Sequence, residues 1–170
     1  GPARAGKDTV GTILHDHFAA SRVSFAEPIR KAIRGMLNLT DEHFHGSLKE
    51  VPLTYLGKSP RQLMQTLGTE WGRGLIHPDI WLLLAEQAID KAMDSLMHVV
   101  VTDVRFENET DLIRRKGGQI WHIRREGGPQ VAPHASEAGV MFHPGKDELI
   151  ENNGTLEELA ERVVNVFSSR

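Results

Sequence analysis

A glycine-bounded loop that runs straight into a helix constrains this chain more than any other feature. The chain opens with Gly1-Pro-Ala-Arg4-Ala5-Gly6-Lys7, and Asp8 and Thr9 follow. Apolar residues then recur at helical spacing, at Val10, Ile13, Leu14 and Phe18. The loop matches seven positions of the phosphate-binding pattern G-x-x-x-x-G-K-[ST]. Glycines let successive backbone N–H groups converge on a phosphate, and the following helix adds its positive dipole end. The loop therefore predicts nucleotide binding; the alternative is a glycine-containing turn that merely precedes a helix.

The residues after the second glycine predict how a nucleotide is held. Lys7 is placed to reach the β and γ phosphates as a point charge. Asp8 stands where serine or threonine usually binds Mg²⁺, and Thr9 brings a hydroxyl one position late. We expect Asp8 and Thr9 to serve the metal, in part through water. A loop of this kind normally leaves the end of a buried strand, so we expect a short hydrophobic strand upstream of residue 1.

An apolar run that ends in an acid gives the second chemical feature. Val99-Val100-Val101 is continuous, which is typical of a parallel strand that is covered on both faces. Asp103 follows it, and in phosphate-loop enzymes such a strand-end aspartate faces Mg²⁺. Ligands gather at the carboxyl ends of strands in open α/β sheets, which supports this interpretation. The alternative is an aspartate that only caps the next turn.

Helical and strand patterns alternate along the remaining chain, which predicts the α/β class. Helices are expected at 10–18, 28–37, from Ser59-Pro60, at 79–93, at 110–116 and from Thr155, and strands at 23–26, 99–101, 119–123 and 149–151. Between these, residues 38–59 are polar and irregular, and residues 126–147 are rich in glycine, proline and histidine. We expect one domain over 1–170, with a parallel sheet flanked by helices on both faces.

Composition excludes several classes of protein. The formal net charge is −3, which argues against wholesale coating of nucleic acid. No apolar run approaches the roughly 20 residues of a membrane span. The chain has no cysteine, which excludes a thiolate zinc site and fits a reducing cytoplasm. Its nine histidines show no set of ligands at metal-binding spacing, so we expect no structural zinc.

Arginines stand at many expected loop and helix edges: Arg4, Arg30, Arg34, Arg61, Arg73, Arg105, Arg124 and Arg125. Phosphoryl transfer between two nucleotides needs several cations, because charge on both donor and acceptor phosphates must be neutralised. Arg105 lies two residues beyond Asp103 and so belongs near the same crevice. For Arg34, Arg114, Arg115 and Arg162 we prefer a solvated surface position.

Several segments together resemble the deoxynucleoside monophosphate kinases of bacteriophages. They appear in the order of that family and span almost the whole chain: Arg4-Ala-Gly-Lys-Asp-Thr9, Ser24-Phe-Ala-Glu-Pro-Ile-Arg30, Pro60-Arg-Gln-Leu-Met-Gln-Thr-Leu-Gly-Thr-Glu-Trp-Gly-Arg73, Thr102-Asp-Val-Arg-Phe-Glu-Asn-Glu109, His134-Ala-Ser-Glu137 and Asn152-Asn-Gly-Thr-Leu156. The two central segments are the most specific. The Gly-Lys-Asp-Thr form is also similar to the loop of that family. Asp8, which departs from the general phosphate-loop pattern, therefore supports the resemblance.

The resemblance implies a P-loop kinase core with a small helical acceptor-binding region at 38–75 and a lid-like loop at 126–147. It implies transfer of the ATP γ-phosphate to a deoxynucleoside 5′-monophosphate in the cytoplasm, that of the host for a phage-encoded enzyme. The implied ATP and Mg²⁺ residues are Arg4, Ala5, Gly6, Lys7, Asp8, Thr9 and Asp103, with Arg124 and Arg125 closing over the donor. The implied acceptor residues are Arg30, Arg61, Gln65, Trp71, Arg73, Arg105, His134 and Glu137. The implied catalytic residues are Lys7, Asp103 and Arg105.

Two other functions remain open at this point. One is a different small-molecule kinase with the same loop, similar to dephospho-coenzyme A kinase. The other is a nucleotide-binding switch or assembly module without catalysis, which would have no use for Arg61 and Arg105. No nucleic-acid or membrane partner is expected, and the resemblance is compatible with a homodimer.

Overall fold

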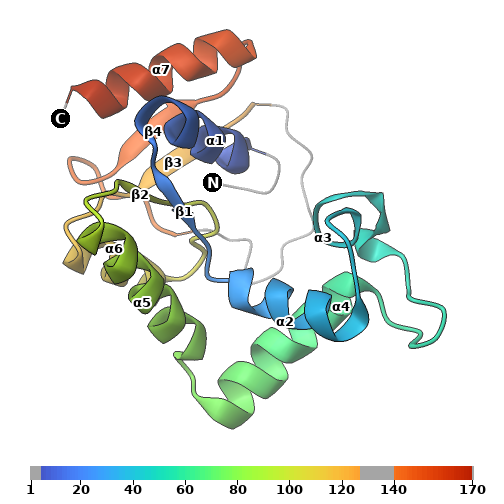
Figure 1. Ribbon diagram of the computed structural model, residues 1–170. Coiled ribbons are helices and arrows are strands. Elements are labelled where there is room, and N and C mark those ends of the chain that lie inside the picture. The colour runs from blue at the N-terminus through green and yellow to red at the C-terminus, as the bar shows by residue number, and fades with distance from the viewer. Residues whose placement is uncertain (1–4, 127–139, 170) are drawn as a thin grey trace. The chain divides into compact units, whose positions relative to one another are not determined.

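The computed structural model describes residues 5–126 and 140–169, and it divides the chain into two compact units (Figure 1). The first unit comprises Gly1–Ser24 and Glu86–Arg170, and the second comprises Phe25–Ala85. Helix α5 (Ile80–Asp94) crosses the boundary between them in sequence. Each unit has its own hydrophobic cluster, so each is described by itself.

The first unit contains two pairs of parallel strands. Strand β1 (Ser21–Val23) pairs with β2 (Val99–Val101), with Arg22 opposite Val100. Strand β3 (Trp121–Arg124) pairs with β4 (Glu148–Glu151), with Ile123 opposite Ile150. The α/β class and the parallel pairing are confirmed. The described strands form two separate sheets, so the single continuous sheet stays a prediction.

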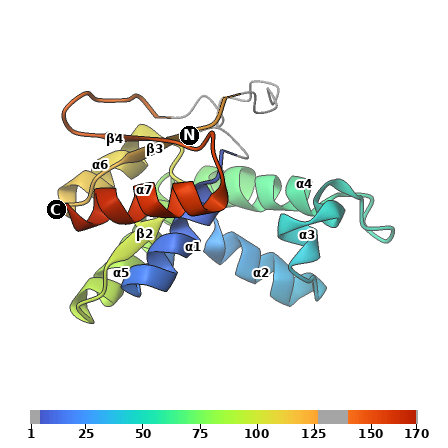
Figure 2. The ribbon, with the colours of Figure 1, turned by 90° about the horizontal axis from the view of Figure 1, so that it is seen from above.

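Two helices share the apolar cluster of the first unit with the β3–β4 pair. Helix α1 (Lys7–Phe18) and helix α7 (Leu156–Ser168) lie side by side in both views (Figures 1 and 2). Val10, Leu14 and Val163 from these helices pack with the β3 and β4 residues Ile123 and Ile150, all of them buried. Helix α6 (Glu107–Arg115) follows β2 and completes the described helices of this unit together with the end of α5.

The second unit is helical. Its elements are α2 (Glu27–Leu37), α3 (Glu42–His45), the short 3-10 helix η1 (Ser47–Glu50), α4 (Pro60–Gln65), the π-helix η2 (Thr66–Ile76) and the start of α5. Ile29, Ile33, Leu39, Phe44 and Trp81 form its core. The indole Nε1 of Trp81 donates to the backbone oxygen of Gly68 at 2.6 Å, which satisfies the one polar atom of that buried side chain.

Most element predictions are confirmed within two or three residues. The Ser59 side chain accepts from the backbone N–H of Gln62, and Thr155 caps α7 in the same way with Glu158. The strand expected at 23–26 instead occupies 21–23, and α6 begins three residues earlier than expected. The π-helix was not anticipated, because apolar periodicity does not separate π from α turns over so short a segment.

None of the helices in the described part of the chain combines the length and the apolar character that crossing a bilayer requires.

Candidate active site

The described end of the predicted phosphate loop, Ala5 and Gly6, turns into α1 through a left-handed backbone conformation at Gly6. Gly6 is the N-cap of α1 at φ 104° and ψ 17°, a conformation that residues with a Cβ rarely adopt. The backbone N–H of Val10 donates to the Gly6 oxygen at 2.9 Å, which begins the helix. The side chain of Asn152, just after β4, donates from Nδ2 to the backbone oxygen of Ala5 at 2.8 Å. A Cβ on Gly6 would lie 2.5 Å from that Nδ2, so the loop packs directly on Asn152.

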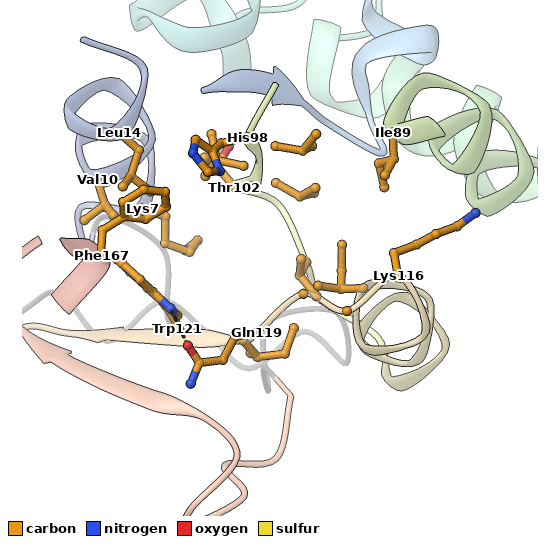
Figure 3. Close-up of a pocket in the computed structure, with 18 of the residues that line it drawn as sticks. Lys7, Val10, Leu14, Ile89, His98, Thr102, Lys116, Gln119, Trp121 and Phe167 are labelled. Atoms are coloured by element: carbon orange, nitrogen blue, oxygen red, sulfur yellow. Dashed lines mark hydrogen bonds between the residues drawn. The ribbon is translucent and has the colours of Figure 1, made fainter. Parts of the chain in front are cut away.

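The first helix approaches the end of β2 closely. A Cβ on Gly11 would lie 2.5 Å from Cγ2 of Thr102, so only glycine permits this approach. Lys7, at the start of α1, and Thr102 both line one pocket of the first unit (Figure 3). Because Asp103 follows Thr102 directly, the structure brings the predicted lysine and the predicted strand-end carboxylate to the same part of the unit.

Asp103 is fixed by a hydroxyl from the neighbouring strand end. Ser24 follows β1 and donates from Oγ to Oδ2 of Asp103 at 2.6 Å, and both side chains are half-buried. Strands β1 and β2 are parallel, so their carboxyl ends lie at one edge, where α/β proteins place their ligands. Asp103 therefore has a defined orientation before any ligand arrives. In the sequence analysis Ser24 appears only within a family-like segment and has no predicted role.

The two remaining candidate metal residues lie in the first turn of α1. Asp8 is exposed and lies 3.9 Å from the guanidinium of Arg22, a solvent-screened pair. Thr9 is half-buried. Within residues 5–126 and 140–169 no group of three or more histidine, cysteine or acidic side chains could hold a metal by itself. Magnesium usually takes one or two carboxylates and completes its shell with water and substrate phosphates, so Asp103 and Asp8 fit it.

Five of the predicted acceptor residues belong to the second unit: Arg30, Arg61, Gln65, Trp71 and Arg73. Arg30 pairs with Glu27 at 2.9 Å, and Arg61 pairs with Glu50 at 3.0 Å. Gln65 is exposed at the end of α4, while Trp71 on η2 is 45% exposed and Arg73 is half-buried. Trp71 thus differs from Trp81, which is buried, and from Trp121, which lines the pocket of the first unit.

The predicted donor-side arginines stand at the end of β3. Arg124 and Arg125 are both exposed. Two asparagines tie this strand end in place: the Asn152 N–H donates to the Arg124 oxygen at 2.7 Å, and Asn153 Oδ1 accepts from the Glu126 N–H at 2.8 Å. Asn152 is thus bonded both to Ala5, in the predicted phosphate loop, and to the Arg124 backbone. The sequence analysis gives Asn152 and Asn153 no role of their own. Their position directly after a strand is the signal that could have indicated one.

Part of the predicted site lies outside the described residues, namely Arg4, His134 and Glu137, together with residues 127–139 of the lid-like loop. The described end of that loop is fastened to α6. The backbone N–H of Met141 donates to the Glu107 carboxylate at 3.0 Å, which lowers the pKa of Glu107.

A buried carboxylate, Asp147, anchors the same end of the loop, and no sequence pattern predicts this role. Its side chain is fully buried and accepts two bonds from Arg114, at 2.9 and 3.2 Å. It also accepts from the backbone N–H of His143 at 2.9 Å and lies 3.2 Å from Nε2 of His122. Burial lowers the pKa of His122, against the raising effect of Asp147, so the ring is neutral near pH 7 and donates from Nε2. Arg114 is therefore not the solvated surface arginine that we expected.

The cavity that Lys7 and Thr102 border is itself apolar. It has a volume of about 440 Å³ and lies between β2 and β3, with α1 on one side and α5 on the other (Figure 3). Consecutive residues 98–102 and 117–123 line it. Side chains of a strand alternate between its two faces, so an unbroken run of lining residues means that the cavity follows the strand edges. It is not a polar nucleotide pocket, although Lys7, at the start of α1, borders it.

The first unit thus contains a glycine at a helix N-terminus, a lysine in the first helical turn and a carboxylate after a parallel strand. Phosphate-loop kinases use residues of these types. The family model of the deoxynucleotide monophosphate kinases matches residues 47–163. The chain belongs to the deoxynucleotide monophosphate kinase family, and it is an enzyme of the kinase class.

Relatives with such names support this membership over different shares of the chain. A protein of Acanthamoeba polyphaga mimivirus, provisionally named a deoxynucleotide monophosphate kinase, is 31% identical over 173 residues, which covers 95% of this chain and 90% of that protein. The deoxynucleoside-5′-monophosphate kinase of Escherichia phage T5 is 50% identical over 66 residues, or 39% of this chain and 26% of that protein. The deoxynucleotide monophosphate kinase of Enterobacteria phage T4 is 34% identical over 110 residues, or 64% and 45%.

Proposed function

We propose that this protein transfers the γ-phosphate of ATP, with Mg²⁺, to the 5′-phosphate of a deoxynucleoside monophosphate. The observation that carries the proposal is the juxtaposition in the first unit of Lys7 with the end of β2, where Ser24 orients Asp103. The names of the related proteins supply the acceptor class. Membership in the family alone would not say which residues of this chain bind the phosphates.

The reaction needs no nucleophilic side chain from the protein. The phosphate oxygen of the acceptor is already an anion at neutral pH, so no general base is required. Catalysis then rests on alignment and on neutralising charge. Lys7 and the N–H groups at the start of α1 hold the donor phosphates, and Arg105 holds the acceptor phosphate. Asp103, Asp8 and Thr9 are the residues that would hold Mg²⁺, which would supply positive charge to neutralise the phosphates.

The metal would be held by few protein groups. Asp103 is the best candidate, because it follows β2 closely in the sequence and the Ser24 hydroxyl orients its carboxylate. Asp8 and the Thr9 hydroxyl are the remaining candidates at the loop. This donor set of oxygen atoms suits a hard cation. The lack of cysteine supports a reducing, cytoplasmic site of action.

We further propose that a short parallel strand, joined to residue 1, fills the apolar cavity between β2 and β3. Among the described residues β2 pairs only with β1 and β3 only with β4, so each has an edge toward the cavity. Apolar side chains of α1 and α5 cover the two sides. A strand there would be apolar on both faces and would make the two parallel pairs one sheet, which is the P-loop core that the sequence predicts.

A coupled ADP-release assay tests the function. Mg-ATP is offered with a panel of deoxy- and ribonucleoside monophosphates, with dephospho-coenzyme A as a control acceptor. Turnover with one or more deoxynucleotides is expected; turnover with dephospho-coenzyme A alone would move the protein to another acceptor class. Binding of ATP without turnover on any acceptor would leave a nucleotide-binding switch.

The lysine has a matched test of its own. Lys7→Ala should remove most turnover without changing the thermal unfolding midpoint, while Lys91→Ala, an exposed lysine on α5, should leave both unchanged. Normal turnover in Lys7→Ala would refute the assignment of the phosphate loop.

The strand proposal is tested by extending the chain before residue 1. Five β-branched apolar residues should raise the unfolding midpoint, because they bury apolar surface and pair two strand edges. Five serine and glycine residues serve as the control of equal length. An equal midpoint for both extensions would exclude the strand.

A further inference from the structure

The segment that carries Arg105 is tied down at both of its ends. On one side, Asp103 accepts from the Ser24 hydroxyl at 2.6 Å. On the other side, the backbone N–H groups of Arg105 and Phe106 both point at one carboxylate oxygen. They donate to Oε2 of Glu109, at 2.7 Å and 3.1 Å. The side chain of Arg105 is therefore exposed, while hydrogen bonds to side chains fix the backbone on both sides of it.

Glu109 is an unusual residue to find buried. It is 3% exposed, and a buried carboxylate is tolerated only where hydrogen bonds replace its water. The two backbone N–H groups supply such bonds, and each bond to a charged acceptor is stronger than one between neutral groups. The same two bonds satisfy N–H groups at the start of α6 that have no partner within the helix.

Comparison with the other helices of the chain shows what is specific to Glu109. At α7 two side chains cap the helix reciprocally. Glu158 accepts from the Thr155 N–H at 2.9 Å, and the Thr155 hydroxyl accepts from the Glu158 N–H at 3.3 Å. At α6 the N-cap is Phe106, whose side chain has no acceptor. Glu109 therefore caps α6 without help from the N-cap side chain, and it reaches one residue further back, to Arg105.

We propose that Glu109 is the positioning residue for Arg105 in phosphoryl transfer, a role that rests on the proposed kinase function. It does not touch the nucleotides. By holding the Arg105 and Phe106 N–H groups, it sets the direction in which the Arg105 guanidinium leaves the backbone. Charge neutralisation at a transferring phosphoryl group depends on such placement, and a displacement of roughly 1 Å can lower the rate on the order of 100-fold.

The test is a double-mutant cycle on turnover, read beside stability. Glu109→Ala should lower kcat by roughly 10- to 100-fold while the KM for ATP changes little, because the donor loop is untouched. In an Arg105→Ala background the same change should lower kcat by less than about twofold, because the group that it positions is gone. Glu109→Gln keeps one acceptor oxygen and should restore most of the rate.

A purely structural cap predicts a different pattern, and Glu158→Ala is the matched control. It removes the equivalent carboxylate from α7 and should reduce the unfolding midpoint with kcat unchanged. If Glu109→Ala does not fold, the cycle is run with Glu109→Gln, whose smaller loss should likewise vanish in the Arg105→Ala background.

Two results would overturn the role, and they are distinguishable. Independent, multiplying losses from Glu109→Ala and Arg105→Ala, in a wild-type protein that is active, would show that Glu109 only caps α6. A wild-type protein without turnover on any deoxynucleoside monophosphate would remove the kinase function itself, and the positioning role with it.

Discussion

Substitution of Gly6 by alanine probes the contact between the phosphate loop and Asn152. Two separate effects are expected. The first is backbone strain, because φ is 104° and a Cβ makes that conformation unfavourable by about 1–2 kcal/mol. The second is steric: the new Cβ would lie 2.5 Å from Nδ2 of Asn152 and push it off the Ala5 oxygen, with the loss of a hydrogen bond worth about 1 kcal/mol. The sum is about 2–3 kcal/mol in the free energy of unfolding.

Two comparisons separate these effects. Gly117→Ala places a Cβ at φ 78° with nothing within 4 Å, so it should show the strain alone, about 1–2 kcal/mol. Asn152→Ala removes the clashing group but leaves the buried Ala5 oxygen without its partner, which costs about 1–3 kcal/mol. The double variant Gly6→Ala/Asn152→Ala should then be more stable than the sum of the single effects by about 1 kcal/mol, because the bond can be lost only once.

Urea unfolding measures the free energy of unfolding of the wild type and of these four variants. ATP titration measures the affinity for ATP in the same proteins. Gly6→Ala should weaken ATP binding more than Gly117→Ala does, since only Gly6 belongs to the loop. Additivity of Gly6→Ala and Asn152→Ala to within about 0.3 kcal/mol would refute the contact and with it the claim that Asn152 holds the loop.

Three further changes test other parts of the molecule. Asp147→Asn should destabilise the protein by about 2–3 kcal/mol, because Arg114 and His143 lose a buried anionic acceptor. Burial acts to raise the pKa of Asp147, but hydrogen bonds from Arg114, His143 and His122 lower it below the ordinary 3.8. The stabilisation by the ionised carboxylate is therefore present above pH 3.8 and is lost as the pH falls through the lowered pKa. The free energies of unfolding of the wild type and of Asp147→Asn, measured in urea, should converge at the acid end of this range. Ser24→Ala should raise the Mg²⁺ concentration needed for half-maximal turnover by a few-fold with an unchanged fold, and an unchanged Mg²⁺ dependence would count against Asp103 as a metal residue. Ser59→Ala should lower stability by about 1 kcal/mol through loss of the α4 cap, measured by thermal unfolding.

Local patterns in the sequence predict the elements that local forces determine. Ser59-Pro60 and Thr155 begin helices because a hydroxyl meets the third N–H of each, and this information lies within four residues. The loop at Gly6 and the strand before Asp103 were recognised in the same way. Long-range partners were not accessible. The bond from Asn152 to Ala5 joins residues 147 positions apart, and no periodicity carries such a pairing.

The same limit explains which residues near the site were missed or misjudged. Arg114 looked like a surface residue because its partner, Asp147, is 33 positions away in a glycine-rich segment. Glu109 was quoted only as part of a family-like segment, since its role depends on an N-cap without an acceptor. The predicted acceptor-binding region, 38–75, lies within the second unit, and its role in binding the acceptor stays a prediction.

The two strand edges along the apolar cavity have a consequence for handling the protein. A strand edge with open N–H and C=O groups beside valine side chains is a template for pairing with another chain. Chains with this cavity unfilled should associate at high concentration through β2 and β3, and light scattering should increase with concentration and with salt, which screens the repulsion between chains of charge −3. Any added apolar peptide that occupies the cavity would then act as a solubiliser.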